Sequence, residues 1–491
     1  MKDIAIVFDC GATNVRVIAI DTHGKIVASH AAANETDADP NLEGGRIWDL
    51  QKLWGKLAAA SLKVTASIDV NRIAGVTFTT FGVDGTFVDK TGNLLYPIVS
   101  WQCDRTTPLI ETIQKYIPNE KLSDISGIYP YAFNTIYKMV WFKENRPDIL
   151  EKASRFLFIP SLLIMKLTGS MLNDVTMCGT SMMTGLFERD FSKQILTAVG
   201  IERDLFGTVG EPGDLAGKVS AAGSVATGIP EQTPVFLAGH DTQFAIYGSG
   251  AELNQPVLSS GTWEILMGRS VVASVNRDKD VRKNLTIELD AVKGVCNMGQ
   301  NWLGSGVLEW FFRNFYSGLS GDKLYETAIA EAEAVAPGSH HLTIDPAFYR
   351  DGESKNAGSI NGLTIATTRG EIFRALLESL SFRLREALEE LERAGGFKAN
   401  EIICVGGGSK NRLWNQLRAD ICRIPVRTID QKETTVLGAS FFVFYGAGVY
   451  TSVEEARSNI DYRPQLICPR PENEKIYDVL YHDYLKNKYM C

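Results

Sequence analysis

Two short polar turns, far apart in the sequence, combine residue types that bind phosphate groups. In the first, the segment IAIVFDCGATNVRVIAID (4–21), two apolar runs typical of buried strands flank the turn DCGATN, and Arg16 follows. Small turn residues let backbone N–H groups approach an anion, and the carboxylate of Asp9 can hold a metal ion. An ordinary solvated turn between two strands is the alternative interpretation.

The second turn repeats this pattern in the other half of the chain. In QPVLSSGTWEILMGRS (255–270), two apolar strands flank the turn SSGT. Gly11 and Gly261 are 250 residues apart, close to half of the 491-residue chain. Two α/β halves that each open with such a hairpin favour an actin-like, ribonuclease H-like architecture, with two domains flanking a central nucleotide cleft. Chance similarity of two turns is the alternative, and the sequence has neither a P-loop nor a dinucleotide-binding fingerprint.

A glycine triplet supports the nucleotide interpretation. Residues 402–405 are typical of a buried strand, Gly406, Gly407 and Gly408 follow, and a helix with an apolar face comes next. Glycines between a strand and a helix leave the backbone open to a ligand near a helix N-terminus, which favours anions. Further on, Gly438 lies in an expected helix and would allow close packing near this loop.

A carboxylate between the two halves is the candidate for proton transfer. In PVFLAGHDTQFAIYGSG (234–250), His240 and Asp241 lie between an expected strand and a helix expected to begin at Phe244. A carboxylate at such a junction is well placed to face a substrate in the cleft. Helix capping by Asp241 and a structural role for His240 are the alternatives.

The elements that must position these segments alternate between strand and helix, which indicates the α/β class. Periodicity predicts strands at 4–9, 15–21, 25–30, 73–82 and 155–159, and helices at 46–64, 134–144 and 370–394.

Composition excludes several other classes of protein. The charged fraction is 22%, and 50 Lys and Arg against 58 Asp and Glu give a net charge of −8, so we expect neither nucleic acid nor membrane as a partner. The eight cysteines are scattered without a Cys-x-x-Cys pair, which fits a reducing cytosol better than a disulfide framework or a zinc site. The start of the chain is a strand pattern that is untypical of a secretory signal.

The chain resembles the FGGY carbohydrate kinase family along nearly its whole length. FNTIYKMVWFKEN (133–145) fits the first family signature, and GSINGLTIATTRGEIFRALLE (358–378) fits the second, with Leu376 in place of a smaller or β-branched residue. The resemblance implies an N-terminal kinase domain at 1–247 on the sugar side, a C-terminal kinase domain at 254–450 on the nucleotide side, and an extension at 451–491.

The resemblance also implies an activity and a set of site residues. It implies ATP- and Mg²⁺-dependent phosphorylation of the 1-hydroxyl of a ketose, with L-fuculose, a 6-deoxy ketohexose, favoured by motifs such as TTFGVDG and VLSSGTWEIL. L-Rhamnulose or another ketose, a non-kinase actin-like ATPase and a sugar sensor without chemistry remain alternatives, and a homodimer is compatible with it. The implied residues are Asp241 as general base; Asp9 for the metal; Gly11, Ala12, Thr13, Asn14, Arg16, Gly261, Thr262, Gly406 and Gly407 for ATP; and Gly82, Asp84, His240, Gln243 and Asn297 for the sugar.

Overall fold

The computed structural model describes residues 2–348, 358–431 and 433–490, which form two compact units. The first unit contains Met1–Gly250, Asp278–Asn297 and Glu433–Asp461, and the second contains Ala251–Arg277, Met298–Lys432 and Tyr462–Cys491. Each unit therefore consists of several separate segments of the chain rather than of one continuous half. Residues 278–297 and 433–461 come from the second half of the sequence but pack with the first unit.

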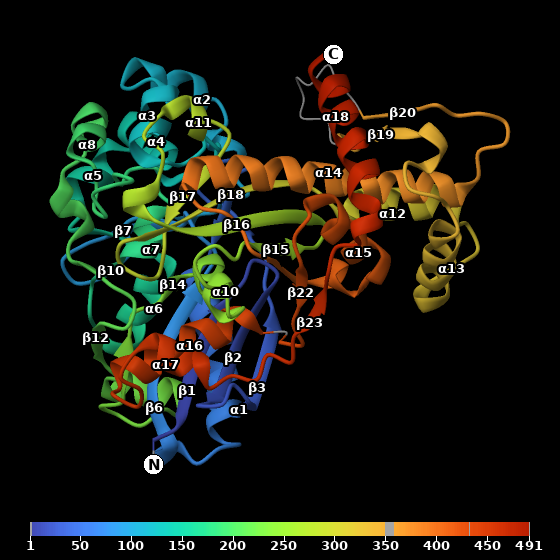
Figure 1. Cartoon of the computed structure of the whole chain (residues 1–491). Coiled ribbons are helices and arrows are strands. Elements are labelled where there is room, and N and C mark those ends of the chain that lie inside the picture. The colour runs from blue at the N-terminus through green and yellow to red at the C-terminus, as the bar shows by residue number, and fades with distance from the viewer. Residues whose placement is uncertain (1, 349–357, 432, 491) are drawn as a thin grey trace. The chain divides into compact units, whose positions relative to one another are not determined.

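The first unit is built on a mixed sheet with strand order β12-β13-β6-β1-β2-β3, in which β14 also pairs with β6 (Figure 1). β1 is antiparallel to β2 and parallel to β6, and β6 is parallel to β13 and β14. All seven residues of β1 are buried, as its unbroken apolar run predicts. The strands are β1 (Ile4–Cys10), β2 (Asn14–Asp21), β3 (Ile26–Ala33), β6 (Ile73–Thr80), β12 (Leu215–Lys218), β13 (Pro234–Phe236) and β14 (Gly239–His240).

Helix α1 (Leu50–Thr65) packs on β2 and β3 and begins later than the sequence predicts. Residues 46–48, expected in this helix, instead form strand β5 (Arg46–Trp48), which pairs with β8 (Ile98–Val99). Asp49 starts the helix because its side chain accepts hydrogen bonds from the N–H groups of the two residues after Leu50.

Helix α16 (Thr434–Gly446) belongs to the first unit, although its sequence follows that of the second. It contacts β1, β6 and α10 (Asp241–Gly248), and Figure 1 shows it, in red, beside the blue strands. A side chain at Gly438 would clash with the backbone of Phe244 in α10. The close packing expected at Gly438 is therefore with α10.

A second core in the first unit surrounds α4 (Thr135–Asn145), the helix predicted at 134–144. It includes residues of β7 (Gly85–Val88), which pairs with β9 (Arg155–Phe158), and of helix α7 (Val175–Gly179). Strand β17 (Thr286–Leu289) contacts α7.

The second unit has its own sheet, with β18, β16, β15, β21, β22 and β23 as successive neighbours. The long helix α14 (Arg369–Gly395) confirms the helix predicted at 370–394 and begins at a capping box made by Thr368 and Glu371. The other elements used below are β15 (Val257–Ser260), β16 (Trp263–Val271), β18 (Val295–Leu303), β21 (Ile402–Val405), β22 (Val426–Thr428), β23 (Gln465–Ile467), α13 (Gly321–Glu333) and α15 (Arg412–Cys422).

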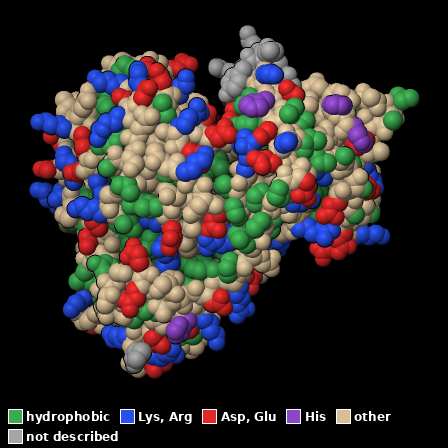
Figure 2. All heavy atoms as spheres, in the orientation of Figure 1, with side chains coloured by type: hydrophobic (Ala, Val, Ile, Leu, Met, Phe, Trp, Pro, Cys, Tyr) green, Lys and Arg blue, Asp and Glu red, His purple; other side chains and the backbone are tan. Residues whose placement is uncertain are grey.

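Acidic and basic side chains are interspersed over the face drawn in Figure 2, in keeping with the near balance of charges in the sequence. Among the described residues, no helix is both long and apolar enough to cross a membrane.

Candidate active site

The first polar turn is a tight connection between β1 and β2. The N–H of Gly11 donates to the carbonyl of Asn14 at 2.9 Å, and a Cβ on Gly11 would lie 2.9 Å from that same oxygen. Asn34, the residue after β3, stabilises the turn with two hydrogen bonds. Its backbone N–H donates to the carbonyl of Thr13, and its side chain donates to the carbonyl of Gly11. The side chains of Thr13 and Asn14 are exposed, so the turn is rigid but open to a ligand.

Asp9 lies at the carboxyl end of β1, opposite Arg16 on β2. Its Oδ2 accepts from Nε and NH2 of Arg16 at 3.0 and 2.5 Å, and its Oδ1 accepts from Thr79 at 3.1 Å. Arg16 also pairs with Glu433 at 2.7 Å. Its guanidinium is thus shared between two carboxylates, and about a third of its side chain is exposed.

The donor set around Asp9 fits Mg²⁺ bound mainly by water and phosphate. No group of three or more metal-ligating side chains is present in the described part of the chain. Mg²⁺ usually takes only one or two protein carboxylates and keeps several waters. Asp9 has Oδ1 free of Arg16, and its negative charge contributes to the raised pKa of Asp241. A cation held by Asp9 would therefore also favour the ionised form of Asp241.

Asp241 is the first residue of α10, directly after β14. The helix begins three residues earlier than the start expected at Phe244. Within the described part of the chain, the carboxylate accepts hydrogen bonds from the N–H and the hydroxyl of the next residue, Thr242, and none from the later N–H groups that a helix cap binds. Its side chain is 29% exposed. The geometry therefore leaves Asp241 open to a substrate.

Burial and nearby charges together determine the pKa of Asp241. Partial burial raises the pKa of Asp241 to about 6, with His240 opposing the rise and Asp9 adding to it. His240 Nε2 lies 3.6 Å from Asp241 Oδ1, and His240 Nδ1 lies 3.3 Å from Glu288 Oε2. Burial alone lowers the pKa of His240, but Glu288, Asp241 and Asp174 together raise it to about 9. At pH 7 an imidazolium therefore lies beside a carboxylate that is mostly ionised.

Backbone contacts hold His240 in place. Its N–H donates to Thr176 Oγ1 at 3.0 Å, and Thr176 in turn donates to Asp174, the N-cap of α7. A Cβ on Gly82 would lie 3.2 Å from His240 Nε2 and 2.9 Å from Thr180, so the glycine leaves room for the imidazole.

Gln243 and Asn297 form a buried polar network with two acidic residues. Gln243 Nε2 donates to Glu288 Oε2 at 2.5 Å, and its Oε1 accepts from Asn297 Nδ2. Asn297 Nδ2 also donates to Asp290 at 2.8 Å. Among the described residues, Asn297 Oδ1 is buried without a hydrogen-bond partner, whereas His240 Nδ1 faces Glu288 Oε2 at 3.3 Å. The Asn297 amide oxygen is thus available to a hydroxyl-rich ligand.

Asp84 is placed differently from the expectation for a sugar ligand, because its side chain is fully buried. Its carboxylate pairs with Lys138 and accepts from the indole of Trp48 at 2.7 Å and from the backbone of Trp101 at 3.0 Å. A sugar hydroxyl would have to displace one of these partners. Lys138 also donates to the carbonyl of Val83, which has a positive φ of 66°.

In the second unit, the turn after β15 lies against the glycine triplet. Gly261 donates its N–H to Trp263 across the turn at 3.1 Å, and Thr262 is exposed. A Cβ on Gly406 would lie 2.7 Å from the carbonyl of Ser260, and one on Gly408 would clash with the Ser260 side chain. The structure therefore brings together the two segments of this unit that were expected to bind the nucleotide.

A buried ion pair holds this second turn. Arg418 on α15 pairs with Glu264 on β16, both fully buried, and donates to Ser260 Oγ at 2.7 Å. Glu264 also accepts from Ser260 at 3.0 Å and from Trp302 at 2.9 Å. The Ser260 hydroxyl is thus engaged inside the protein.

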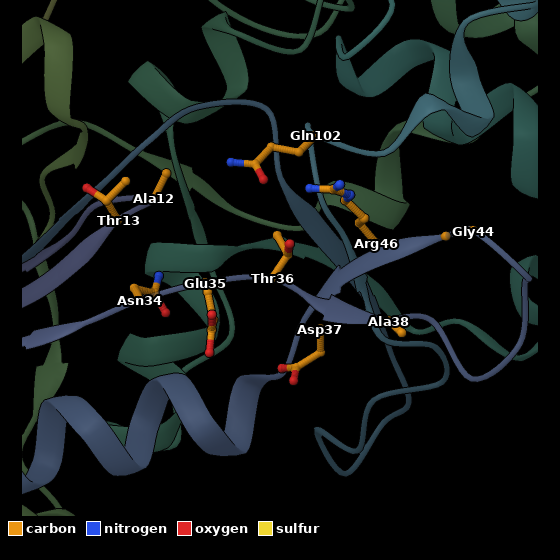
Figure 3. A pocket seen from close by; sticks show the side chains of 11 residues that line it. Ala12, Thr13, Asn34, Glu35, Thr36, Asp37, Ala38, Gly44, Arg46 and Gln102 are labelled. Atoms are coloured by element: carbon orange, nitrogen blue, oxygen red, sulfur yellow. The ribbon is translucent and has the colours of Figure 1, made fainter.

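A pocket of about 580 Å³ opens beside the first turn within the first unit (Figure 3). Thr13 and Asn34 line one part of it, and Arg46 and Gln102 line another. Of the residues expected in the site, Ala12 and Thr13 line this pocket, whereas those expected to bind the sugar do not.

These features agree with a known class of enzyme: the chain belongs to the FGGY family of carbohydrate kinases. The model of the family's N-terminal domain matches residues 4–248, and that of the C-terminal domain matches residues 257–447. The resemblance seen in the sequence is confirmed, and the protein is a sugar kinase, a phosphotransferase.

Particular relatives are similar over almost the whole chain. The L-fuculokinase of Escherichia coli K12 is 44% identical, with 97% of this chain and 100% of that protein covered, and the L-fuculokinase of Haemophilus influenzae is 41% identical, with 95% and 99% covered. The crystal structure of xylulose kinase from Rhodospirillum rubrum has a TM-score of 0.89 at 19% identity, over 99% of this chain and 98% of that one. This likeness confirms the predicted fold class, an α/β protein with two sheet-containing, actin-like domains.

Sequence reasoning missed Glu288 and Arg418. Glu288 lies in a short segment, TIEL, whose alternation predicts only a half-buried strand. Arg418 lies on the apolar helix α15, where a charged residue would be expected to face solvent. No local pattern distinguishes either residue, since their partners are distant in the sequence.

Proposed function

We propose that the protein transfers the γ-phosphoryl group of ATP to the 1-hydroxyl of L-fuculose, forming L-fuculose 1-phosphate and ADP. The observation that carries the proposal is Asp241, a partly exposed carboxylate 3.6 Å from His240, in a chain 41–44% identical to proteins named L-fuculokinase. Phosphoryl transfer needs chiefly positioning and charge neutralisation, together with an oriented nucleophile.

In this proposal Asp241 accepts the proton of the 1-hydroxyl as that oxygen bonds to the γ-phosphorus. The bond from phosphorus to the bridging oxygen of ADP then breaks. A positioned base usually contributes about 10²–10⁴-fold to the rate. The His240 imidazolium keeps Asp241 ionised before the reaction, which supports its role as base at neutral pH.

The two polar turns would bind the phosphates. Gly11, Ala12, Thr13, Asn14 and Arg16 would contact them from the first unit. Gly261, Thr262, Gly406 and Gly407 would bind the nucleotide from the second. Asp9 would hold Mg²⁺, which neutralises charge on the phosphate oxygens when bound.

The sugar would bind on the polar side chains around Asp241. Asn297 Oδ1 would offer an acceptor, while Gln243 orients the Asn297 amide, and Glu288 orients both Gln243 and His240. Gly82 would leave space beside His240. Asp84 would contribute indirectly, because its carboxylate accepts a hydrogen bond from the backbone N–H of Trp101 and so positions that residue.

A panel of ketoses with coupled detection of ADP tests this function. We expect ADP release to depend on sugar and L-fuculose to give the highest kcat/KM. If L-rhamnulose or D-xylulose is better by a factor of about ten, the enzyme is a kinase of another ketose. ADP release that no sugar accelerates would contradict the kinase proposal and favour a non-kinase ATPase.

A further inference from the structure

Glu288 belongs to a segment that the second half of the sequence contributes to the first unit. Residues Asp278–Asn297 pack with that unit, and within them β17 contacts α7. The same α7 carries Thr176, which accepts a hydrogen bond from the backbone of His240. Glu288 thus comes from a part of the chain distant from Asp241 but reaches the residue beside it.

One carboxylate oxygen of Glu288 fixes two side chains. Oε2 accepts from Gln243 Nε2 at 2.5 Å and lies 3.3 Å from His240 Nδ1. On the other side of the ring, Gly82 leaves room for the imidazole, since a Cβ there would lie 3.2 Å from Nε2. Without Glu288, the Gln243 amide would lose its charged partner, and His240 would lose one of its acidic neighbours while keeping Asp241.

The other oxygen, Oε1, has no hydrogen-bond partner among the described residues, and 14% of the side chain is exposed. Nearby, Asn297 Oδ1 is buried and also lacks a hydrogen-bond partner within the described chain. Leaving such groups unpaired is unfavourable, so a ligand or water is expected to bind them. A carboxylate oxygen and an amide oxygen both accept hydrogen bonds, and the hydroxyl groups of a polyol can donate to them.

We propose that Glu288 is a sugar-recognition residue, whose Oε2 positions His240 and Gln243 while its Oε1 accepts a hydrogen bond from a hydroxyl of the ketose. This inference rests on the proposed function. It adds that sugar affinity depends on a residue outside the first half of the sequence.

The variant Glu288→Gln tests the proposal, because it keeps the size of the side chain but removes its charge. Hydrogen bonds to an ionised acceptor are about twice as strong as neutral ones. We expect KM for L-fuculose to rise about tenfold or more, with KM for ATP and the melting temperature close to wild type. Glu144→Gln is the matched control, since Glu144 also pairs with charged and polar partners, Lys115 and Tyr116, but lies outside the site.

Direct binding of L-fuculose, measured by calorimetry without ATP, separates this proposal from the proposed function. Weaker sugar binding by Glu288→Gln, with ATP binding intact, supports it. Equal sugar binding by wild type and variant overturns the role of Glu288 and leaves the kinase proposal standing. Equal losses of sugar affinity, ATP affinity and melting temperature would show a merely structural role.

A wild type that neither binds nor phosphorylates any ketose contradicts both proposals. If Glu288→Gln does not fold, Glu288→Asp, which retains the charge but shortens the reach to Gln243, is compared in the same way.

Discussion

Asp241 combines the two properties that a general base requires at neutral pH. It is partly exposed, and burial holds its pKa at about 6, close to the pH at which it must work. His240 limits this rise, because its positive charge favours the ionised carboxylate. If Asp241 is the base, as proposed, this pair should therefore set the acidic limit of activity.

The acidic side of the pH–rate profile tests this arrangement. A base must be unprotonated, so kcat/KM should be half-maximal near pH 6, level off about one pH unit above it and fall about tenfold per pH unit well below it. In His240→Asn the opposing charge is absent, so the midpoint should move to higher pH, whatever the change in KM. A midpoint that stays in place in this variant would contradict the coupling of the two residues.

Asp84 has a structural role that can be separated from sugar binding. Lys138→Met leaves the Asp84 carboxylate buried without its cation, so we expect the free energy of unfolding to fall by about 3–5 kcal/mol. Urea denaturation measures this change. Lys115→Met, which removes an exposed partner of Glu144, should change stability by less than about 1 kcal/mol. A wild-type stability in Lys138→Met would show that the buried pair contributes little.

Among the elements, the two turns are equivalent in topology, since each connects antiparallel strands of a different sheet. Thr13→Val and Thr262→Val should each raise KM for ATP or lower kcat, because each removes a hydroxyl from an exposed turn while keeping its shape. Melting temperatures should remain near wild type. Thr327→Val, at a half-buried position of α13 where the hydroxyl only bonds the carbonyl of Lys323 one turn earlier, serves as the control. Unchanged kinetics in both turn variants would exclude a paired phosphate site.

The contact between α10 and α16 determines where Asp241 lies. Gly438→Ala would place a Cβ against the backbone of Phe244, so we expect a loss of about 1–3 kcal/mol in stability. Gly55→Ala in α1 is a matched control, since no heavy atom lies within 4 Å of its added Cβ. That change should be neutral or stabilising by up to about 1 kcal/mol. Equal effects in thermal denaturation would contradict close packing of the two helices.

Local sequence patterns predicted the strands and helices whose formation depends mainly on their own residues. The strands at 4–9 and 15–21 and the helix at 370–394 are found nearly as expected, since apolar periodicity or an unbroken apolar run marks each of them. The predicted start of the helix at 46–64 was wrong, because residues 46–48 pair with β8 and form a strand instead. Tertiary contacts of this kind leave no local signal.

At the scale of the whole molecule, the division of the chain could be predicted only in part. The repeated turns predicted two similar halves. They did not predict that residues 278–297 and 433–461 pack with the first unit, because this packing depends on contacts between residues far apart in the sequence. Glu288 and the partner of Gly438 were missed for the same reason.

The central claim is that Asp241 takes a proton from a ketose hydroxyl, and Asp241→Asn tests it most directly. The side chain does not cap α10, and Asn resembles Asp in shape, so the melting temperature and ATP affinity should stay near wild type. Asn cannot accept the proton, so L-fuculose-dependent ADP release should fall by about two to four decades. All three quantities are measured on one preparation, with wild type beside it. A variant that melts normally, binds ATP and still turns over at more than about a tenth of the wild-type rate would contradict the account.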